Sequence, residues 1–302
     1  MNKEQALISS TTSQTYHWRD VAGLKIFYRE AGPADGPAVV LLHGYPSTSK
    51  MYTPLIPLLA AAGYHVIAPD YPGFGLSDAP TPAQYSYTFE NIARTMNQLL
   101  SELGMENYAL FMQDYGGPVG FRMAMANSKA VNAIIVQNGN AYEEGLGAKW
   151  GTLFKYWQDP EAHPEVMDAF VSFKSVRQRH LGNSPNPQRY NPEAWHEEFA
   201  MLSRPGSRAI QSTLFYDYQN NVKSYPVWQK WMREHQPPAL ILWGKYDPSF
   251  IVPGAKAFKR DLPDAELHIL DAGHFALEEA NEEIAELVID FLAREVKKPK
   301  EQ

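Results

Sequence analysis

The chain has 302 residues, and none of them is cysteine. Disulfide bonds, thiol catalysis and cysteine-ligated metal sites are therefore excluded. Uninterrupted apolar runs of the ~20 residues that a membrane-spanning helix needs are missing as well. Residues 1–15 are polar and lack the apolar core of a secretory signal. We therefore expect neither a membrane segment nor export, which is consistent with a cytoplasmic location.

Dense runs of Lys and Arg are also missing, and the formal net charge is −7. A nucleic-acid-binding surface needs clustered cations to neutralise phosphates, so nucleic acid is not expected as a partner. What is present is the composition of a globular protein, with 44% hydrophobic and 20% charged residues. The length suits one large α/β sheet that carries an insertion.

Short continuous apolar runs alternate with helical patterns along most of the chain. Such runs are typical of parallel strands buried on both faces, and their alternation with helices predicts a parallel α/β sheet. An antiparallel hairpin around Ala22 and Gly23 is expected at one edge of this sheet. The predicted hairpin strands are 16–19 and 25–29, the later strands 39–42, 65–68, 109–112, 133–136, 240–243 and 267–270, and the helices 54–62, 89–103, 120–126 and 278–294.

Residues 141–235 interrupt this alternation. They contain no run of buried-strand type, but they are rich in aromatic residues among helical pieces bounded by proline. We interpret them as a helical cap domain inserted into a core domain of residues 1–140 and 236–302. Most of the aromatic side chains should form the cap's own core, and a few should line a cleft beneath it. Its tryptophans are Trp150, Trp157, Trp195, Trp228 and Trp231.

The stretch 108–120, YALFMQDYGGPVG, places an acid between a predicted strand and a predicted helix. This layout resembles a nucleophile elbow, the sharp strand-to-helix turn that exposes a reactive side chain. Asp114 stands at the elbow position, where a carboxylate attacks a saturated carbon through oxygen and forms an ester. The alternative is that Asp114 only caps the following helix, because Asp is a favoured N-cap residue.

A second loop, residues 41–46 with the sequence LLHGYP, also follows a predicted strand. A loop at this place supplies one backbone N–H of an oxyanion hole, and the residue after the nucleophile supplies the other. The expected donors are the N–H groups of Tyr45 and Tyr115, which would hold the oxyanion formed when water attacks the ester. His43 is expected to be structural.

Two later loops supply an acid and a base. Asp247, in WGKYDP (243–248), follows a predicted strand at the edge where open α/β sheets build their sites. His274, in DAGHFALE (271–278), follows the last predicted strand, and the chain order of nucleophile, acid and histidine is that of a known triad arrangement. Asp247 is therefore expected to orient His274, which is expected to act as the base.

The roles of Asp247 as the acid and His274 as the base each have an alternative in the sequence. Asp247 could serve only as a turn or cap residue before the proline that follows it. Glu143 and Glu144 follow another predicted strand and are a rival placement for the acid. His268 lies inside a predicted strand and is a poorer base than His274.

These stretches, together with DYPGFGLSD at 70–78, resemble the epoxide hydrolase and haloalkane dehalogenase branch of the α/β-hydrolases. The resemblance implies the α/β-hydrolase fold and a hydrolase that needs no cofactor and no metal ion. It also implies that Asp114 alkylates, that His274 activates water to cleave the ester, and that Asp247 supports the histidine. The expected partners are a small apolar organic substrate and water; the oligomeric state is not predicted.

The type of hydrogen-bond donor facing Asp114 separates the two chemistries. Epoxide opening produces an alkoxide that needs a proton, which a tyrosine hydroxyl can give, whereas indole and amide N–H groups only cradle a halide. The segment FYDYQN (215–220) resembles the stretch that carries a cap tyrosine in epoxide hydrolases, with Tyr218 as first choice and Tyr216 as second. Tyr45 and Tyr115 replace the Asn and Trp that are customary halide donors in dehalogenases.

Epoxide hydrolase is therefore the first interpretation, and haloalkane dehalogenase is the alternative. A haloacetate dehalogenase is disfavoured because no arginine adjoins Asp114, and a serine esterase because the elbow carries no serine. A non-catalytic sensor of small apolar ligands is less favoured, since it has no need for Asp114, Asp247 and His274 together.

Overall fold

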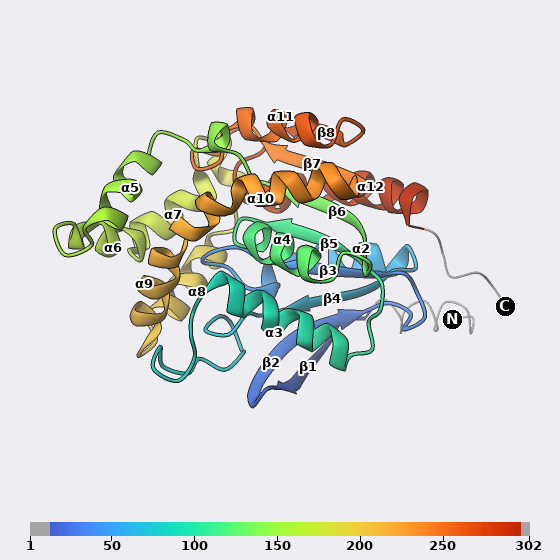
Figure 1. Cartoon of the computed structure of the whole chain (residues 1–302), viewed down its shortest axis with the longest axis horizontal. Coiled ribbons are helices and arrows are strands. Elements are labelled where there is room, and N and C mark those ends of the chain that lie inside the picture. The colour runs from blue at the N-terminus through green and yellow to red at the C-terminus, as the bar shows by residue number, and fades with distance from the viewer. Residues whose placement is uncertain (1–12, 297–302) are drawn as a thin grey trace.

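The computed structural model describes residues 13–296, so the expectation for residues 1–15 falls mostly outside the described residues. Within this range the strands are β1 (Thr15–Val21), β2 (Leu24–Ala31), β3 (Ala38–Leu42), β4 (His65–Pro69), β5 (Tyr108–Gln113), β6 (Val131–Gln137), β7 (Ala239–Gly244) and β8 (Glu266–Leu270). They form one sheet in the order β1-β2-β4-β3-β5-β6-β7-β8 (Figure 1). The β1–β2 and β2–β4 pairs are antiparallel and the other neighbours are parallel.

Helices cover both faces of the sheet, as the continuous apolar strands predict. Val40 and Leu42 of β3 pack into one apolar cluster, and Val39 and Leu41 pack into another on the opposite face. The first cluster is covered by α3 (Phe89–Glu102), α4 (Gly116–Ala126), α10 (Gln219–His235) and α11 (Val252–Asp261). The second is covered by α2 (Ile56–Ala61), after the short 3-10 helix η1 (Ser49–Tyr52), and by α12 (Ala276–Glu295).

Two helices differ from the sequence prediction. Helix α4 begins at Gly116 rather than at residue 120, directly after the elbow. Helix α11 was not predicted. Its first turn, Val252-Pro253-Gly254, contains the helix-breaking residues proline and glycine, which together usually mark a turn. Proline is nevertheless compatible with the first turn of a helix, where its missing N–H is not needed.

The segment between β6 and β7 is helical: η2 (Glu143–Gly145), α5 (Trp150–Gln158), α6 (Pro164–Phe170), α7 (Phe173–Leu181), η3 (Pro187–Arg189), α8 (Pro192–Leu202), α9 (Ser207–Asp217) and α10. In Figure 1, helices α5 to α9 gather beyond one end of the sheet, while α10 runs back along the core. Trp228 of α10 stacks on Phe121 of α4, with ring centroids 5.2 Å apart. The division into cap and core at residues 141 and 235 stays a prediction.

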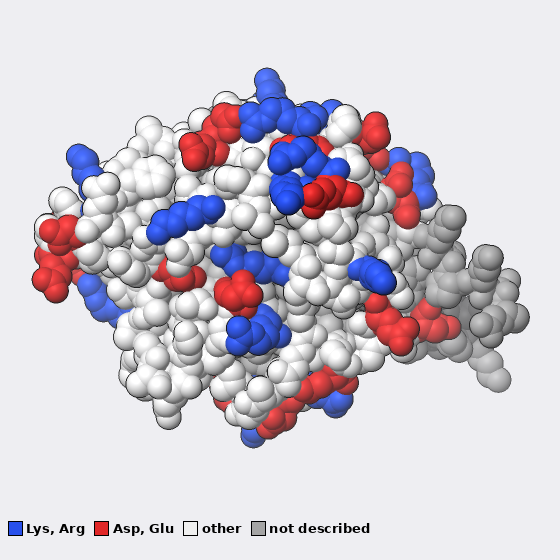
Figure 2. Space-filling model, in the orientation of Figure 1, with Lys and Arg blue, Asp and Glu red and all other residues white. Residues whose placement is uncertain are grey.

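On the face drawn in Figure 2, basic and acidic side chains are interspersed and do not gather into a large patch of one sign. No helix among residues 13–296 combines the length and the apolarity needed to cross a bilayer.

Candidate active site

The backbone at Asp114 makes a sharp turn between β5 and α4. Its φ is +48°, in the left-handed region that residues other than glycine rarely adopt. The turn is closely packed, because a Cβ on Gly44 would lie 2.1 Å from the side-chain oxygen of Gln113 and 2.5 Å from Cβ of Asp114. Glycine at position 44 therefore lets the β3 loop touch the side chain of the elbow residue. Such local strain is commonly found at functional sites.

The two carboxylate oxygens of Asp114 have different partners. The backbone N–H of Tyr45 donates to Oδ1 at 2.8 Å, and Oδ2 lies 3.5 Å from Nε2 of His274. The carboxylate thus faces the two loops that sequence reasoning selected, rather than capping α4. Tyr115 is the N-cap residue directly before α4, so its backbone N–H lies next to the elbow residue in the chain.

His274 lies between two buried carboxylates. Its Nδ1 is 2.7 Å from Oδ2 of Asp247, and its Nε2 faces Asp114. His274 and Asp247 are 2% and 3% exposed. Burial alone would lower the pKa of His274, but the charge of Asp247 and hydrogen bonds to both carboxylates raise this pKa to about 9. The ring is therefore an imidazolium at neutral pH in the resting protein.

Asp247 accepts hydrogen bonds from four donors. Its Oδ2 accepts from His274 and from Nδ2 of Asn138 at 2.9 Å. Its Oδ1 accepts from the backbone N–H groups of Ser249 at 2.6 Å and Phe250 at 3.1 Å. Asp247 is thus both the partner of the histidine and a turn residue. Burial raises the pKa of Asp247, but the charge and hydrogen bond of His274 outweigh it and lower the pKa overall.

Asn138 is a member of this network that sequence reasoning missed. It follows β6 directly with a φ of +45°, and its amide bridges Asp247 and the end of β7, where Gly244 N–H donates to its Oδ1 at 2.8 Å. A polar residue at the carboxyl end of a buried parallel strand is the signal that could have identified it.

The rival residues lie elsewhere. Glu143 and Glu144 are exposed, and Glu144 forms an ion pair with Arg260. His268 is part of β8 and lies 4.0 Å from Glu266. His43 is buried, its Nδ1 is 3.0 Å from the carbonyl of Gly44, and burial lowers its pKa.

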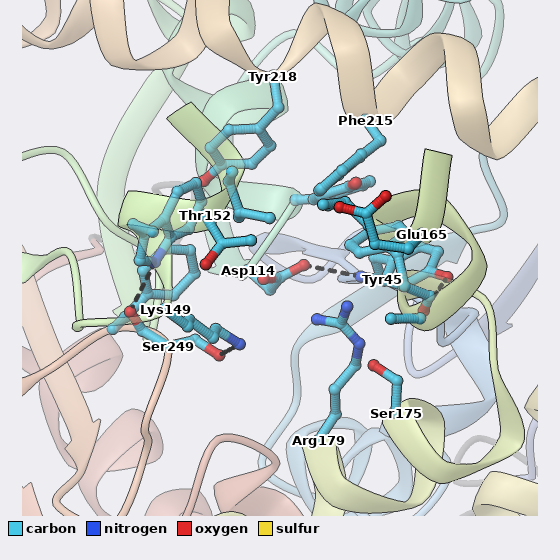
Figure 3. A pocket seen from close by; sticks show the side chains of 17 residues that line it. Tyr45, Asp114, Lys149, Thr152, Glu165, Ser175, Arg179, Phe215, Tyr218 and Ser249 are labelled. Atoms are coloured by element: carbon cyan, nitrogen blue, oxygen red, sulfur yellow. Dashed lines mark hydrogen bonds between the residues drawn. The ribbon is translucent and has the colours of Figure 1, made fainter. Parts of the chain in front are cut away.

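Asp114 opens into a cavity of about 370 Å³ that lies beneath the helices between β6 and β7. Figure 3 shows Tyr218 and Phe215 entering the cavity from one side and Arg179 and Ser175 from the other, with Asp114 between them. The walls are mainly aromatic and aliphatic, and the charged lining residues besides Asp114 are Lys149, Glu165 and Arg179. Sequence reasoning identified none of these three.

The two candidate tyrosines are placed differently. Tyr218 lines the cavity and is 3% exposed, whereas Tyr216 is 45% exposed and does not line it. Burial, followed by the neighbouring Tyr225 and the Asp114 carboxylate, raises the pKa of Tyr218 well above its ordinary value. Its hydroxyl therefore keeps its proton at neutral pH.

The indole N–H groups at this cavity are already bonded. Trp150, which lines it, donates to the carbonyl of Ser249 at 2.9 Å. Trp157, whose ring stacks against Tyr218 at 6.2 Å, donates to the carbonyl of Phe215 at 2.9 Å. Among the described residues, no group of three or more His, Asp or Glu side chains is arranged to hold a metal ion.

Residues 37–281 match the family described as alpha/beta hydrolase fold. Over 277 residues, the chain is 41% identical to an uncharacterized hydrolase of Saccharomyces cerevisiae, covering 90% of this chain and 94% of the relative. Over 286 residues, it is 30% identical to a haloalkane dehalogenase of Psychrobacter cryohalolentis, covering 89% and 88%. The crystal structure of Epoxide Hydrolase A from Mycobacterium thermoresistibile is similar in fold, with a TM-score of 0.70, 21% identity and coverage of 93% and 99%.

The chain therefore belongs to the α/β-hydrolase fold family, and the predicted fold class is confirmed. The protein is a hydrolase with a haloalkane dehalogenase among its sequence relatives, and it shares its fold with a solved epoxide hydrolase.

Proposed function

We propose that the protein hydrolyses epoxides to diols through an alkyl ester on Asp114. Tyr45 N–H holds Oδ1 of Asp114, so Oδ2 is the oxygen that attacks the epoxide carbon. The carbon–oxygen bond of the ring breaks, its electron pair passes to the ring oxygen, and Tyr218 gives that oxygen a proton. His274 returns a proton to the Tyr218 oxygen, and the neutral ring then takes one proton from the water that attacks the ester carbonyl. The bond between the ester carbonyl carbon and the substrate oxygen breaks, that oxygen takes up the second proton of the water, and the diol leaves with Asp114 restored as a carboxylate.

The observation that carries this proposal is the chain of contacts from Asp247 through His274 to Asp114. Its distances are 2.7 Å and 3.5 Å. Oδ1 of Asp114 becomes the oxyanion when water attacks, and the Tyr45 N–H already points at it; Tyr115 N–H is the proposed second donor. A protein that only binds a ligand would have no use for a histidine buried between two carboxylates.

The donors around the cavity favour an epoxide over an alkyl halide. Indole N–H groups are not free to bind a halide here, because those of Trp150 and Trp157 both donate to backbone carbonyls. Tyr218 instead offers a buried hydroxyl that remains protonated. Halide displacement is the second candidate, because the same three side chains would serve it and a relative of 30% identity is named haloalkane dehalogenase.

Residues 141–235 act as a cap domain in this proposal. They contribute the aromatic walls of the cavity at Trp150, Phe170 and Phe215, together with the proton donor Tyr218, while the core contributes Asp114. The apolar walls suit the hydrocarbon part of a small substrate.

The test uses a panel of epoxides and haloalkanes, with diol and halide as the products measured. We expect diol formation by the parent protein and none by Asp114→Asn, because a neutral amide neither attacks carbon nor forms the ester. His274→Gln should alkylate but fail to hydrolyse, so intact-mass measurement should find the substrate's mass added to Asp114. Halide release without any diol formation would replace the first function by the second, and normal turnover by His274→Gln without an adduct would contradict the mechanism.

A further inference from the structure

Arg179 presents an unpaired cation to the cavity. It belongs to α7, and its guanidinium lies 4.8 Å from the ring centroid of Tyr45 and 4.5 Å from that of Phe170. Its Nε is buried and has no hydrogen-bond partner, and among residues 13–296 no carboxylate lies within ion-pair distance of it. A buried charged donor without an acceptor is unfavourable, so this group is suited to an acceptor that arrives with a ligand.

Lys149 presents a second cation to the same cavity. Its ammonium donates to the hydroxyl of Ser249 and has no carboxylate within ion-pair distance in the described part of the chain. Lys149 is an exposed residue that also lines the cavity. Burial, followed by the charge of Arg179, lowers the pKa of Lys149 to about 8, against the opposing effect of Asp247 and Asp114.

The carboxylates at the cavity do not neutralise these cations. Asp114 faces the imidazolium of His274, and its charge disappears once it forms an ester. Glu165 has a side chain that is 69% exposed and lies 3.3 Å from His163. Two like charges that face one cavity repel each other, and an anion bound between them would relieve the repulsion.

We propose that the substrate carries a carboxylate, which Arg179 binds with support from Lys149 while the reactive ring lies between Asp114 and Tyr218. This rests on the proposed function, because it assigns a substrate class to the same site. The planar guanidinium matches a carboxylate with two parallel hydrogen bonds. In Figure 3, Arg179 enters on the side of Asp114 opposite to Tyr218, so an epoxide held between Asp114 and Tyr218 would direct a neighbouring carboxylate toward Arg179.

The experiment compares one epoxide in a charged and a neutral form. The probes are 3-phenylglycidate and 3-phenylglycidamide, which differ only in a carboxylate against an amide. We expect kcat/KM of the parent protein to be at least ~10-fold higher for the acid. Arg179→Gln should lower this acid-to-amide ratio by about tenfold or more, chiefly through a higher KM for the acid. Arg179→Lys, which keeps the charge but loses the planar fork, should give an intermediate ratio.

The matched control is Arg177→Gln, because Arg177 is an exposed arginine of the same helix that does not line the cavity. Its acid-to-amide ratio should equal that of the parent. Equal kcat/KM for acid and amide in the parent protein would overturn the proposal. An equal loss on both substrates in Arg179→Gln would do the same, since it would assign Arg179 to the reaction of any epoxide. If Arg179→Gln does not fold, the parent comparison and Arg179→Lys still decide.

A binding measurement separates this inference from the proposed reaction. The parent protein is titrated by calorimetry with 3-phenylpropionate and 3-phenylpropanamide, neither of which can react. Tighter binding of the carboxylate by ~10-fold, reduced in Arg179→Gln, supports the subsite even if no epoxide in the panel is opened. In that case only the proposed reaction would fail, whereas equal binding of the two compounds would overturn the subsite alone.

Discussion

The charge of Asp114 helps to keep His274 protonated, so Asp114→Asn should lower the pKa of His274. The two groups are 3.5 Å apart and both are buried. A carboxylate at such a distance raises the pKa of a histidine by about 1–3, and burial acts in the opposite direction. From the resting value of about 9, the pKa of His274 should fall to between about 6 and 8 in the variant. The ring should then be partly or wholly neutral at pH 8.

The measurement is an NMR titration of isotope-labelled histidine rings in the parent protein and in Asp114→Asn, with mass measurement to exclude deamidation. His180 is the internal control, because Glu198 and Glu278 raise its pKa to about 10 against the effect of burial and neither is changed. An unchanged or higher pKa of His274 in the variant, with that of His180 unchanged, would refute the electrostatic coupling between Asp114 and His274.

Three further substitutions, one of them with a matched control, test other contacts of the site. Four donors converge on the two oxygens of Asp247, and Asp247→Asn leaves only one oxygen to accept them. Ester hydrolysis should therefore slow by about 10³- to 10⁴-fold, and rapid quenching should detect the accumulated alkyl ester. Tyr218→Phe should slow single-turnover epoxide opening by ~10²-fold, whereas Tyr216→Phe, at an exposed position, should leave it within about twofold. The buried carboxylate of Glu279 accepts a hydrogen bond from the backbone N–H of Gly273, the residue before His274. Glu279→Gln weakens this acceptor, so urea unfolding should give a free energy of unfolding lower by about 1–3 kcal/mol. An unchanged free energy of unfolding would argue against that role.

Sequence reasoning could select Asp114, Asp247 and His274 because each follows a predicted parallel strand, although the strand before His274 carries the polar residue His268. Parallel strands end at one edge of the sheet, so residues far apart in the chain must meet there. The elbow was identifiable for a second reason, namely that glycines follow the acid where α4 approaches β3. At Gly116 a Cβ would lie 2.1 Å from the carbonyl oxygen of Leu42, so this pattern reflects a steric requirement.

Most of the residues that line the cavity could not be predicted from the sequence. The spacing of apolar residues in a helix tells which face is buried, but not which surface of the core it covers. In the sequence, Arg179 and Lys149 are therefore not distinguishable from surface charges. Arg179 belongs to α7 and Lys149 directly precedes α5, and only the packing of these segments brings both residues to the cavity. The same limit applies to the tyrosines, because Tyr216 and Tyr218 are two residues apart near the end of α9 and only the packing separates them.

The position of His274 between two carboxylates lets one ring serve both halves of the proposed reaction. In the resting protein both acids favour the imidazolium. After alkylation Asp114 is a neutral ester, so only Asp247 still holds the proton and burial opposes it. His274 then gives its proton to the Tyr218 phenolate, which replaces the proton that Tyr218 gave to the product oxygen, and the neutral ring can take a proton from water. Hydrolysis of the ester restores both the charge of Asp114 and the imidazolium, so the base is formed only while an ester is present.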